Sequence, residues 1–361
     1  MQSHYADRRA RAIDRLEAAK LPALAVSHLP NVRYLTGFTG SNALLLLSPR
    51  EPILFTDPRY EVQAGTECDC RVQVVHGPLT TALAAALKRR RIPIAGVESD
   101  HLTLQQHRQL LEAGGGRFRL RAVSGLVEAL RAVKSPAEIE AIRASVILNS
   151  KAYERALPLI KPGMKELDLA AEIEYQMKRL GAEGPAFETI VAAGPRSAMP
   201  HARPSPQLLC SNQLLLIDMG ASLNGYASDM TRVVHLGTPG RATRRLHDAV
   251  REAQQAALDE VRAGVIAARV DAAARQALKR WKLDHTFKHS TGHGLGLEIH
   301  ESPRIGKKAT APLQAGMVVT IEPGAYLEGF GGVRLEDTVL VTDNGCEVLT
   351  PTSKELLVYQ A

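Results

Sequence analysis

Four acidic residues in the second half of the chain stand in or beside apolar stretches, where an ionised side chain needs a partner. Asp218 follows the apolar run of residues 214–217, and Glu322 follows the largely apolar run of residues 317–321. The other two are Asp229 and Glu336. An unpaired buried carboxylate is costly, so a metal ion, an arginine or a hydrogen-bond network must compensate it. For Asp218 taken alone, hydrogen bonds to loop amides at a strand end are the simpler explanation.

The first pair of these carboxylates flanks a hairpin signal. Asn224-Gly225 between two strand-like runs is typical of a type I′ turn, whose two central residues both have positive φ. If these two residues form the turn, Asp218 pairs with Thr231 across the hairpin. Asp229 is then the diagonal neighbour of Asp218 on the same face. Diagonal neighbours lie roughly 7–8 Å apart, less between side chains, so the two carboxylates could share one cation.

The second pair repeats this arrangement with a longer connection. Glu322 and Glu336 are equally far along the chain from Gly329, which lies in a glycine-rich stretch. A hairpin centred on Gly329 would place the two glutamates directly opposite each other. Two hairpins that each present a carboxylate pair on one face are hard to explain by structure alone, because four ionised groups with nothing bound would raise one another's pKa.

Histidines near this acidic set are further candidates for metal ligation or catalysis. His293 lies between two glycines, and glycine lets the backbone approach a site closely. One imidazole with four carboxylates is a hard, oxygen-rich ligand set that favours manganese, cobalt or zinc over a thiolate zinc site. Bridging carboxylates hold two ions ~3.5–4 Å apart, the spacing of hydrolytic two-metal centres. Three more histidines have no evident structural role, although a single loop histidine is more often a surface residue: His201, His289 and His300.

The elements that must position these residues fall into two regions. In residues 1–131, short apolar runs bounded by Pro, Gly, Ser or Asp alternate with helical patterns, which predicts an α/β domain with a mixed or parallel sheet. The expected strands cover residues 23–26, 43–47, 53–55, 72–75 and 94–97, and the expected helices cover residues 5–20, 79–90 and 103–112.

The second region, residues 132–361, begins close to a strong helix start. Ser135 stands at the N-cap, Pro136 at the first helical position and Glu138 at the third, which is a capping box. The helices expected here cover residues 136–157, 166–180, 241–262 and 268–281, and the expected strands cover residues 214–219, 226–236, 317–322 and 333–341. The order helix–helix–hairpin therefore occurs twice, which predicts an α+β domain with a coarse internal repeat.

The composition argues against a nucleic-acid-binding, a disulfide-rich or a membrane-spanning protein. The chain has 361 residues, a formal net charge of +7 and an aromatic content of 4%. The basic runs at residues 88–91 and 241–245 are not interleaved with aromatic residues, so we expect solvated helix faces and no nucleic-acid partner. The chain has too few cysteines for a disulfide framework, and no stretch approaches the ~20 apolar residues of a membrane span. We therefore expect a cytoplasmic protein that does not bind membranes.

Five short segments of the second region together resemble the motifs of the aminopeptidase P, prolidase and methionine aminopeptidase superfamily, whose catalytic domain has the pita-bread fold. They are residues 216–220, 228–232, 291–294, 320–324 and 333–337, in the order and spacing of that superfamily. Residues 33–38 resemble a motif of the creatinase/prolidase N-terminal domain. We therefore expect an α/β domain of that type at residues 1–131 and a pita-bread catalytic domain at residues 132–361.

The resemblance implies a ligand set for two divalent metal ions. Asp218 would chelate one ion and His293 with Glu322 the other, while Asp229 and Glu336 would bridge the two. Manganese is the expected metal, with cobalt or zinc as alternatives. A hydroxide that bridges the ions would attack the scissile carbonyl, because two cations lower the pKa of a bound water.

The resemblance also implies roles for residues around the metals. Glu322 would carry the proton from the attacking water to the leaving prolyl nitrogen. His201 and His300 would stabilise the tetrahedral intermediate and hold the substrate. His289 and Arg334 would line the proline side of the pocket.

The activity implied by this resemblance is removal of the residue that precedes proline at the N-terminus of peptides, as in Xaa-Pro aminopeptidases. The extra N-terminal domain argues against methionine aminopeptidase. A prolidase that acts only on dipeptides is the main alternative, and no residue of the sequence decides between the two. A metal-free creatinase-like enzyme and a non-catalytic binding protein of the same fold are disfavoured, because all five ligand types are intact. A homodimer is also implied.

Overall fold

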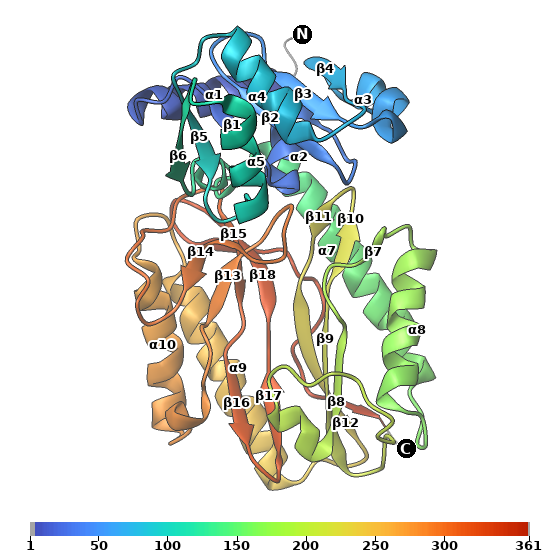
Figure 1. Ribbon diagram of the computed structural model, residues 1–361. Coiled ribbons are helices and arrows are strands. Elements are labelled where there is room, and N and C mark those ends of the chain that lie inside the picture. The colour runs from blue at the N-terminus through green and yellow to red at the C-terminus, as the bar shows by residue number, and fades with distance from the viewer. Residues whose placement is uncertain (1–3, 360–361) are drawn as a thin grey trace. The chain divides into compact units, whose positions relative to one another are not determined.

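The protein is described here by a computed structural model that covers residues 4–359 (Figure 1). The chain divides into two compact units, Met1–Arg131 and Ala132–Ala361. Within the residues that the structure describes, none of the helices combines the length and the apolarity that a membrane crossing requires.

The first unit is built on a mixed sheet with the strand order β4-β3-β2-β1-β5-β6. Its strands are β1 (Leu24–Val26), β2 (Ala43–Leu47), β3 (Ile53–Thr56), β4 (Arg71–Val74), β5 (Ile94–Glu98) and β6 (Arg119–Val123). Its helices are α1 (His4–Ala18), α2 (Leu29–Thr36), α3 (Glu61–Glu67), α4 (Leu79–Arg89), α5 (Leu104–Gly114) and α6 (Glu128–Arg131). Strand β1 pairs antiparallel with β2 and parallel with β5, so the expected α/β architecture with a mixed sheet is confirmed.

The second unit contains long helices and several connected sheets. Its helices are α7 (Pro136–Ala156), α8 (Glu166–Arg179), α9 (Arg241–Glu260) and α10 (Ala267–Arg280). Its strands are β7 (Gly184–Pro185), β8 (Ile190–Ala193), β9 (Gln213–Met219), β10 (Ala221–Leu223), β11 (Tyr226–Ala227), β12 (Met230–Leu236), β13 (Gly292–Gly294), β14 (Glu301–Ile305), β15 (Val318–Ile321), β16 (Gly324–Leu327), β17 (Gly331–Arg334), β18 (Asp337–Val341), β19 (Cys346–Val348) and β20 (Leu357–Tyr359). Strand orders are β20-β12-β9-β8, β14-β13-β15-β18-β19, β11-β10-β7 and β16-β17.

Helix α7 begins at the residue that the capping signal indicates. The Ser135 hydroxyl accepts a hydrogen bond from the Glu138 amide, and the Glu138 carboxylate accepts one from the Ser135 amide at 3.0 Å. The reciprocal bonds satisfy two donors that a helix start leaves unpaired. The capping box predicted from the sequence is therefore confirmed.

The register of the first hairpin is the one that the turn signal predicts. Asn224 and Gly225 have φ values of 50° and 75°, as a type I′ turn requires. Thr231 is the cross-strand partner of Asp218. Asp229 lies between β11 and β12, one residue outside the regular ladder.

The second hairpin is also centred on Gly329. Ile321 pairs with Asp337 on one side, and Gly324 pairs with Arg334 on the other. The ladder is interrupted between these pairs, where Glu322 and Glu336 stand. The interruption separates β15 and β18 from β16 and β17, so the expectation of continuous strands over residues 317–322 and 333–341 is wrong at these two points.

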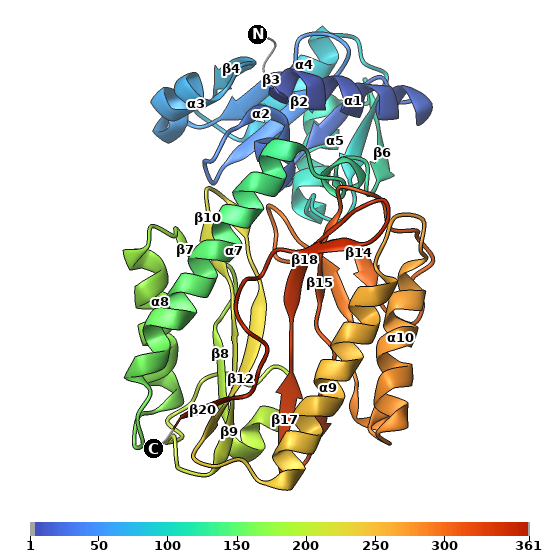
Figure 2. The same cartoon turned by 180° about the vertical axis from the view of Figure 1, so that it is seen from behind.

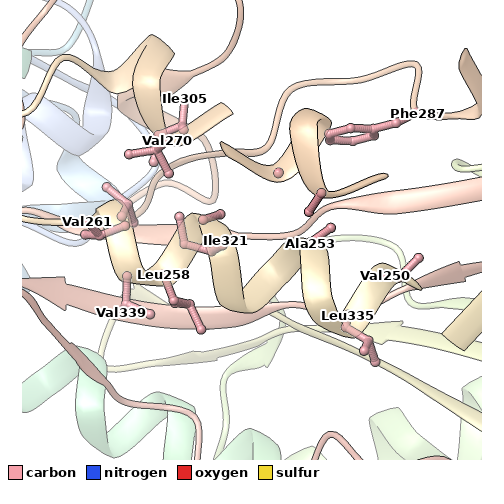
Figure 3. Close-up of a cluster of buried hydrophobic side chains, with 14 of the residues drawn as sticks. Val250, Ala253, Leu258, Val261, Val270, Phe287, Ile305, Ile321, Leu335 and Val339 are labelled. Carbon is pink, nitrogen blue, oxygen red and sulfur yellow. The ribbon is translucent and has the colours of Figure 1, made fainter. Parts of the chain in front are cut away.

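Helices cover the outer faces of these hairpins. Figures 1 and 2 show α7 and α8 on one side of the second unit and α9 and α10 on the other, with the strands between them. In Figure 3, Val250 and Ala253 of α9 lie against Ile321 and Leu335 within one buried apolar cluster. Glu322 and Glu336 directly follow Ile321 and Leu335, at the interruption of the ladder.

Helices also cover one face of the first hairpin. Leu215, Ile217 and Met219 of β9 pack in a buried cluster with side chains of α7 and α8. Asp218 therefore emerges on the face opposite to those helices. The other three carboxylates stand at interruptions of the strands: Asp229, Glu322 and Glu336.

Candidate metal centre

The structure brings the imidazole of His293 together with the carboxylates of both hairpins. Nε2 of His293 lies 3.6 Å from Oδ2 of Asp229 and 3.6 Å from Oε1 of Glu322. Ligand atoms of Asp229, His293 and Glu336 all lie within 4.8 Å of one another. Three segments that are far apart in the sequence therefore converge on one point, with spacings suited to cations.

Local hydrogen bonds fix which nitrogen of His293 faces the carboxylates. Its Nδ1–H donates to the Gly294 carbonyl at 3.0 Å, and its amide donates to the Thr320 hydroxyl at 3.1 Å. Burial lowers the pKa of His293 to about 4, so the ring is neutral at physiological pH. A neutral imidazole whose Nδ1 is engaged presents Nε2 as a metal ligand.

The carboxylates are buried together, and this raises their proton affinity. Burial raises the pKa of Asp229, and the charge of Glu336 raises it further. The pKa of Glu336 is raised by burial and then by the charges of Glu322 and Asp218. Burial also raises the pKa of Glu322, to about 8. A pair of divalent cations would remove this repulsion and hold all four groups ionised.

Asp218 provides a direct test of whether cations fit here. Its Oδ2 accepts a hydrogen bond from Nη2 of Arg334 at 2.5 Å. Its Oδ1 is buried, and within residues 4–359 no group donates a hydrogen bond to it. Buried carboxylate oxygens are normally satisfied by a donor or a metal. The unsatisfied oxygen, beside three other carboxylates and a ligand-ready imidazole, fits divalent metal ions.

Arg334 is a buried cation at the edge of this cluster, with every guanidinium nitrogen engaged. Besides Asp218, it donates to the Thr231 hydroxyl at 3.0 Å, the Tyr326 hydroxyl at 2.8 Å and the Pro200 carbonyl at 3.2 Å. Burial by itself lowers the pKa of Arg334, but the negative groups around it outweigh burial and keep the pKa well above the usual value. Arg334 therefore remains charged and offsets part of the acidic charge.

A buried ion pair ties the two hairpins together behind the carboxylates. Arg232 donates to the Asp337 carboxylate at 2.7 Å and to the Glu336 carbonyl at 2.5 Å. The Glu336 amide in turn donates to the Thr231 carbonyl at 3.2 Å. Removing one member of a buried pair leaves an uncompensated charge, so this contact holds the hairpins in a fixed relation.

The remaining histidines lie around the carboxylate cluster. The His300 ring meets the His293 ring edge to face, with centroids 4.4 Å apart. His289 Nδ1 lies 3.9 Å from Oε2 of Glu322. Burial lowers the pKa of His300, and that of His289 together with the charge of Arg334. His201 is exposed and adds a smaller lowering of the pKa in both, which places it near them.

A buried carboxylate holds the segment that carries His201. Glu166, fully buried at the start of α8, accepts hydrogen bonds from the Ala193 amide at 2.8 Å and from the Ser205 amide at 3.0 Å. Arg196 also donates to Glu166, at 3.0 Å from its Nε. Both ends of residues 193–205 are thereby attached to one side chain.

Two residues of this network are not among the candidates that the sequence indicates. The Tyr326 hydroxyl accepts from Arg334 and donates to Nε2 of His289 at 2.7 Å. The Thr231 hydroxyl accepts from Arg334 and donates to Glu336 at 2.7 Å. The predicted register places Thr231 opposite Asp218, so the sequence contains the information that would identify Thr231 as a neighbour of the carboxylates. Tyr326 gives no such signal, because its contacts come from distant segments.

Comparison with known families gives a match over each unit. The family model described as Metallopeptidase family M24 matches residues 140–343. The model described as Creatinase/Prolidase N-terminal domain matches residues 8–133. The two matches fall in the same order as the two compact units.

Individual relatives match at substantial identity. An Xaa-Pro dipeptidase of Pyrococcus furiosus is 44% identical over 237 residues, which cover 66% of this chain and 68% of the relative. The solved structure of an Xaa-Pro dipeptidase from Bacillus anthracis has a TM-score of 0.95 and 33% identity, over 98% of this chain and 99% of that chain. That of an X-Pro aminopeptidase from Thermotoga maritima has a TM-score of 0.90 and 35% identity, over 96% and 99%.

Proposed function

Since this chain belongs to metallopeptidase family M24 and combines its catalytic domain with a creatinase/prolidase N-terminal domain, we propose that it is an Xaa-Pro aminopeptidase. It is a hydrolase that acts on peptides with the help of divalent metal ions. The finer proposal is that it cleaves the bond before a proline in the second position. The resemblance to pita-bread metallopeptidases and the expected fold class are confirmed.

The observation that carries the proposal is the convergence of five ligand-type side chains on one buried point. We propose that Asp218 holds one ion, that His293 and Glu322 hold the other, and that Asp229 and Glu336 bridge them. The unsatisfied Oδ1 of Asp218 and the ligand-ready Nε2 of His293 support this assignment. When bound, the ions would polarise the scissile carbonyl and lower the pKa of the attacking water. We propose Mn²⁺ as the metal, because the set is dominated by carboxylate oxygens.

Side chains of the protein complete the reaction. Glu322 accepts the proton of the attacking water and delivers it to the leaving prolyl nitrogen, which cannot depart as an anion. His201 and His300 donate hydrogen bonds to the oxyanion that develops on the former carbonyl oxygen. His300 suits this role because its ring lies edge to face with His293, directly beside the cluster.

We propose that His289 contacts the proline ring of the substrate with its face. Both ring nitrogens are already engaged, Nδ1–H by the Ser290 carbonyl at 2.9 Å and Nε2 by the Tyr326 hydroxyl at 2.7 Å. Burial lowers the pKa of His289 to about 3, so the ring stays neutral and suits an apolar partner. Arg334 supports this side of the pocket by holding Tyr326.

An Xaa-Pro dipeptidase is the second candidate, and the names of the relatives from Pyrococcus furiosus and Bacillus anthracis favour it. A dipeptide ends in a carboxylate that needs a cation. Arg304 is exposed and is the cross-strand partner of His293, so its side chain shares the face of that ligand. If dipeptides are the substrates, Arg304 is the residue we expect to bind the carboxylate.

The deciding experiment measures hydrolysis of Gly-Pro and of Gly-Pro-Pro by metal-stripped protein, with Mn²⁺ added back or withheld. Mn²⁺-dependent cleavage of the tripeptide supports the aminopeptidase. Cleavage of the dipeptide alone, with a raised KM in Arg304→Ala, supports the dipeptidase. If neither peptide is cut with any divalent metal, the proposal fails.

Assembly is a separate proposal. We propose that the chain forms a homodimer, because it resembles superfamily members that have both domains. Light scattering at several protein concentrations measures the mass of the particle. A monomer at all concentrations would contradict it.

A further inference from the structure

A second group of metal-ligating side chains lies in the first unit. His28 follows β1, His101 follows β5 and Glu128 begins α6. Oε1 of Glu128 lies 3.6 Å from Nε2 of His101 and 4.0 Å from Nδ1 of His28. Ligand atoms of the three residues all lie within 4.8 Å of one another. None of these residues belongs to the metal centre of the second unit.

A buried hydrogen-bond network orients this group. Asn31, which is completely buried, donates to Glu128 at 2.5 Å and to Glu98 at 2.7 Å. Glu98 also accepts from the backbone amide of His28 at 2.7 Å. The Asn31 side-chain oxygen accepts from Arg131 at 2.8 Å. Outer partners of this kind fix the orientation of metal ligands and are a regular part of metal sites.

We propose that His28, His101 and Glu128 form a divalent metal site of the first unit, and that it takes zinc. Two imidazoles and one carboxylate are a ligand set that zinc accepts, with a fourth position left open. Imidazole suits zinc better than manganese, which prefers oxygen ligands. This site therefore differs in metal preference from the carboxylate-rich centre of the second unit.

The distances are close to those that zinc requires. Ligand atoms at ~2.0–2.1 Å from a tetrahedral zinc ion lie roughly 3.3–3.4 Å apart. The 3.6 Å and 4.0 Å separations from Glu128 exceed this value by less than about 1 Å, but the two rings must also be reoriented. The His28 and His101 rings now lie parallel, with centroids 3.5 Å apart. An imidazole binds a metal in its own plane, so one ring must turn out of the stack.

His101 is the ring that can turn. Its side chain is 30% exposed, whereas that of His28 is 13% exposed. A small pocket beside it is lined by Asp100, His101 and Glu128, together with residues 123–127. The pocket has room for about one water, and that water or Asp100 can supply the fourth ligand.

The consequence of binding is structural. The ion would join the end of β1, the end of β5 and the start of α6, which are distant in sequence. Any ligand that binds only the folded state raises the stability of that state by mass action. Zinc bound here would therefore stabilise the first unit without taking part in peptide hydrolysis.

The test counts metal ions in the full-length protein. Mn²⁺-loaded protein is incubated with excess ZnCl₂ and desalted, and total manganese plus zinc per chain is measured by plasma mass spectrometry. We expect His101→Ala to retain about one ion per chain fewer than the wild type and to cleave its peptide substrate at the wild-type rate. His76→Ala, which changes an exposed histidine of the same unit, is the control and should match the wild type.

A second pair of variants separates this site from the metal centre. His293→Ala loses metal from the second unit, and adding His101→Ala to it should remove about one further ion. Glu128→Gln keeps the size of the side chain and an acceptor for Asn31, so it serves if His101→Ala does not fold. Equal metal counts in the wild type and in the folded variants of His101 and Glu128 would overturn the proposal, whatever the peptidase activity.

Discussion

The two groups of metal-ligating side chains differ in the number of carboxylates that they bring together. The metal centre of the second unit gathers four carboxylates around His293, and Arg334 offsets only part of their charge. The group in the first unit has two imidazoles and a single carboxylate, Glu128. The carboxylate cluster of the second unit is buried, whereas the side chains of His101 and Glu128 in the first unit are 30% and 28% exposed.

If both proposals hold, the metal centre depends on its ions more strongly than the first-unit site does. In the metal centre, burial and mutual repulsion raise the pKa of Asp229 and Glu336, so the folded chain without metal carries stored repulsion. In the first unit, ring stacking and a hydrogen bond from Asn31 hold two imidazoles beside the single carboxylate of Glu128. Metal removal should therefore act strongly on one group and weakly on the other.

The largest expected effect comes from removing the imidazole of the metal centre. Partners that merely orient metal ligands are worth about 10–100-fold in metal affinity or activity. We expect His293→Ala, which deletes a ligand, to lower turnover by more than about 100-fold. Circular dichroism should show a native fold. Near-wild-type turnover would show that His293 is not a ligand.

The next effect concerns His201, which we propose to face the metal centre without binding metal. Removing one donor to a developing oxyanion typically lowers kcat by about 10²–10³-fold. We expect this loss for His201→Ala, with metal content unchanged. Plasma mass spectrometry on the same preparation supplies the control. A parallel loss of metal would identify His201 as a ligand.

A smaller effect is expected from the carboxylate that holds the His201 segment. Glu166→Gln replaces an acceptor of several backbone and side-chain donors, and misplacement of a catalytic group lowers kcat, here by about tenfold. KM and metal content should change little. In a double variant with His201→Ala, the Glu166→Gln change should have no further effect on kcat, because the group that it positions is gone. An additive loss would assign Glu166 to general stability instead.

The smallest expected effect is on how the stability of the metal-free protein depends on pH. The raised pKa values of Glu322, Asp229 and Glu336 mean that the folded, metal-free chain binds more protons than the unfolded chain. Stability from these groups is present at low pH and is lost as pH rises toward the Glu322 pKa of about 8. The lowered pKa of His293 acts in the opposite direction, but only below about pH 6.5.

We therefore expect the melting temperature of chelator-treated protein to fall by at least about 2 °C between pH 6.5 and pH 8, and that of Mn²⁺-loaded protein to fall less. Glu336→Gln should reduce the dependence of melting temperature on pH in the metal-free protein. Glu128→Gln, in the first unit, should leave the slope unchanged. A slope that is the same with and without metal would contradict the stored repulsion in the metal centre.

Much of the metal centre follows from local sequence signals. The Asn224-Gly225 turn fixes the pairing of Asp218 with Thr231, and symmetry about Gly329 fixes the opposition of Glu322 and Glu336. The capping box at Ser135 likewise locates the start of α7. Each of these signals is contained within a few residues or a single hairpin.

The features that the sequence does not reveal depend on distant contacts. Strand β20 pairs in parallel with β12, more than a hundred residues earlier in the chain, and no local pattern specifies that partner. His293, between its two glycines, lies in the short strand β13, which exists because β14 and β15 flank it, and no local pattern predicts that strand. Tyr326 joins Arg334 to His289 only once three segments have folded together.

Arg334 gives this enzyme a link between metal loading and the geometry of its reaction site. Its guanidinium bonds both the Asp218 carboxylate and the carbonyl of Pro200, the residue before His201. An ion on the unsatisfied Oδ1 of Asp218 would share this carboxylate with Arg334, which bonds Oδ2, so that metal binding changes the charge that Arg334 faces and with it the restraint on the neighbouring segment. Such coupling is reciprocal in free energy. Ligands that order the His201 segment will therefore also change the affinity of the chain for its metals.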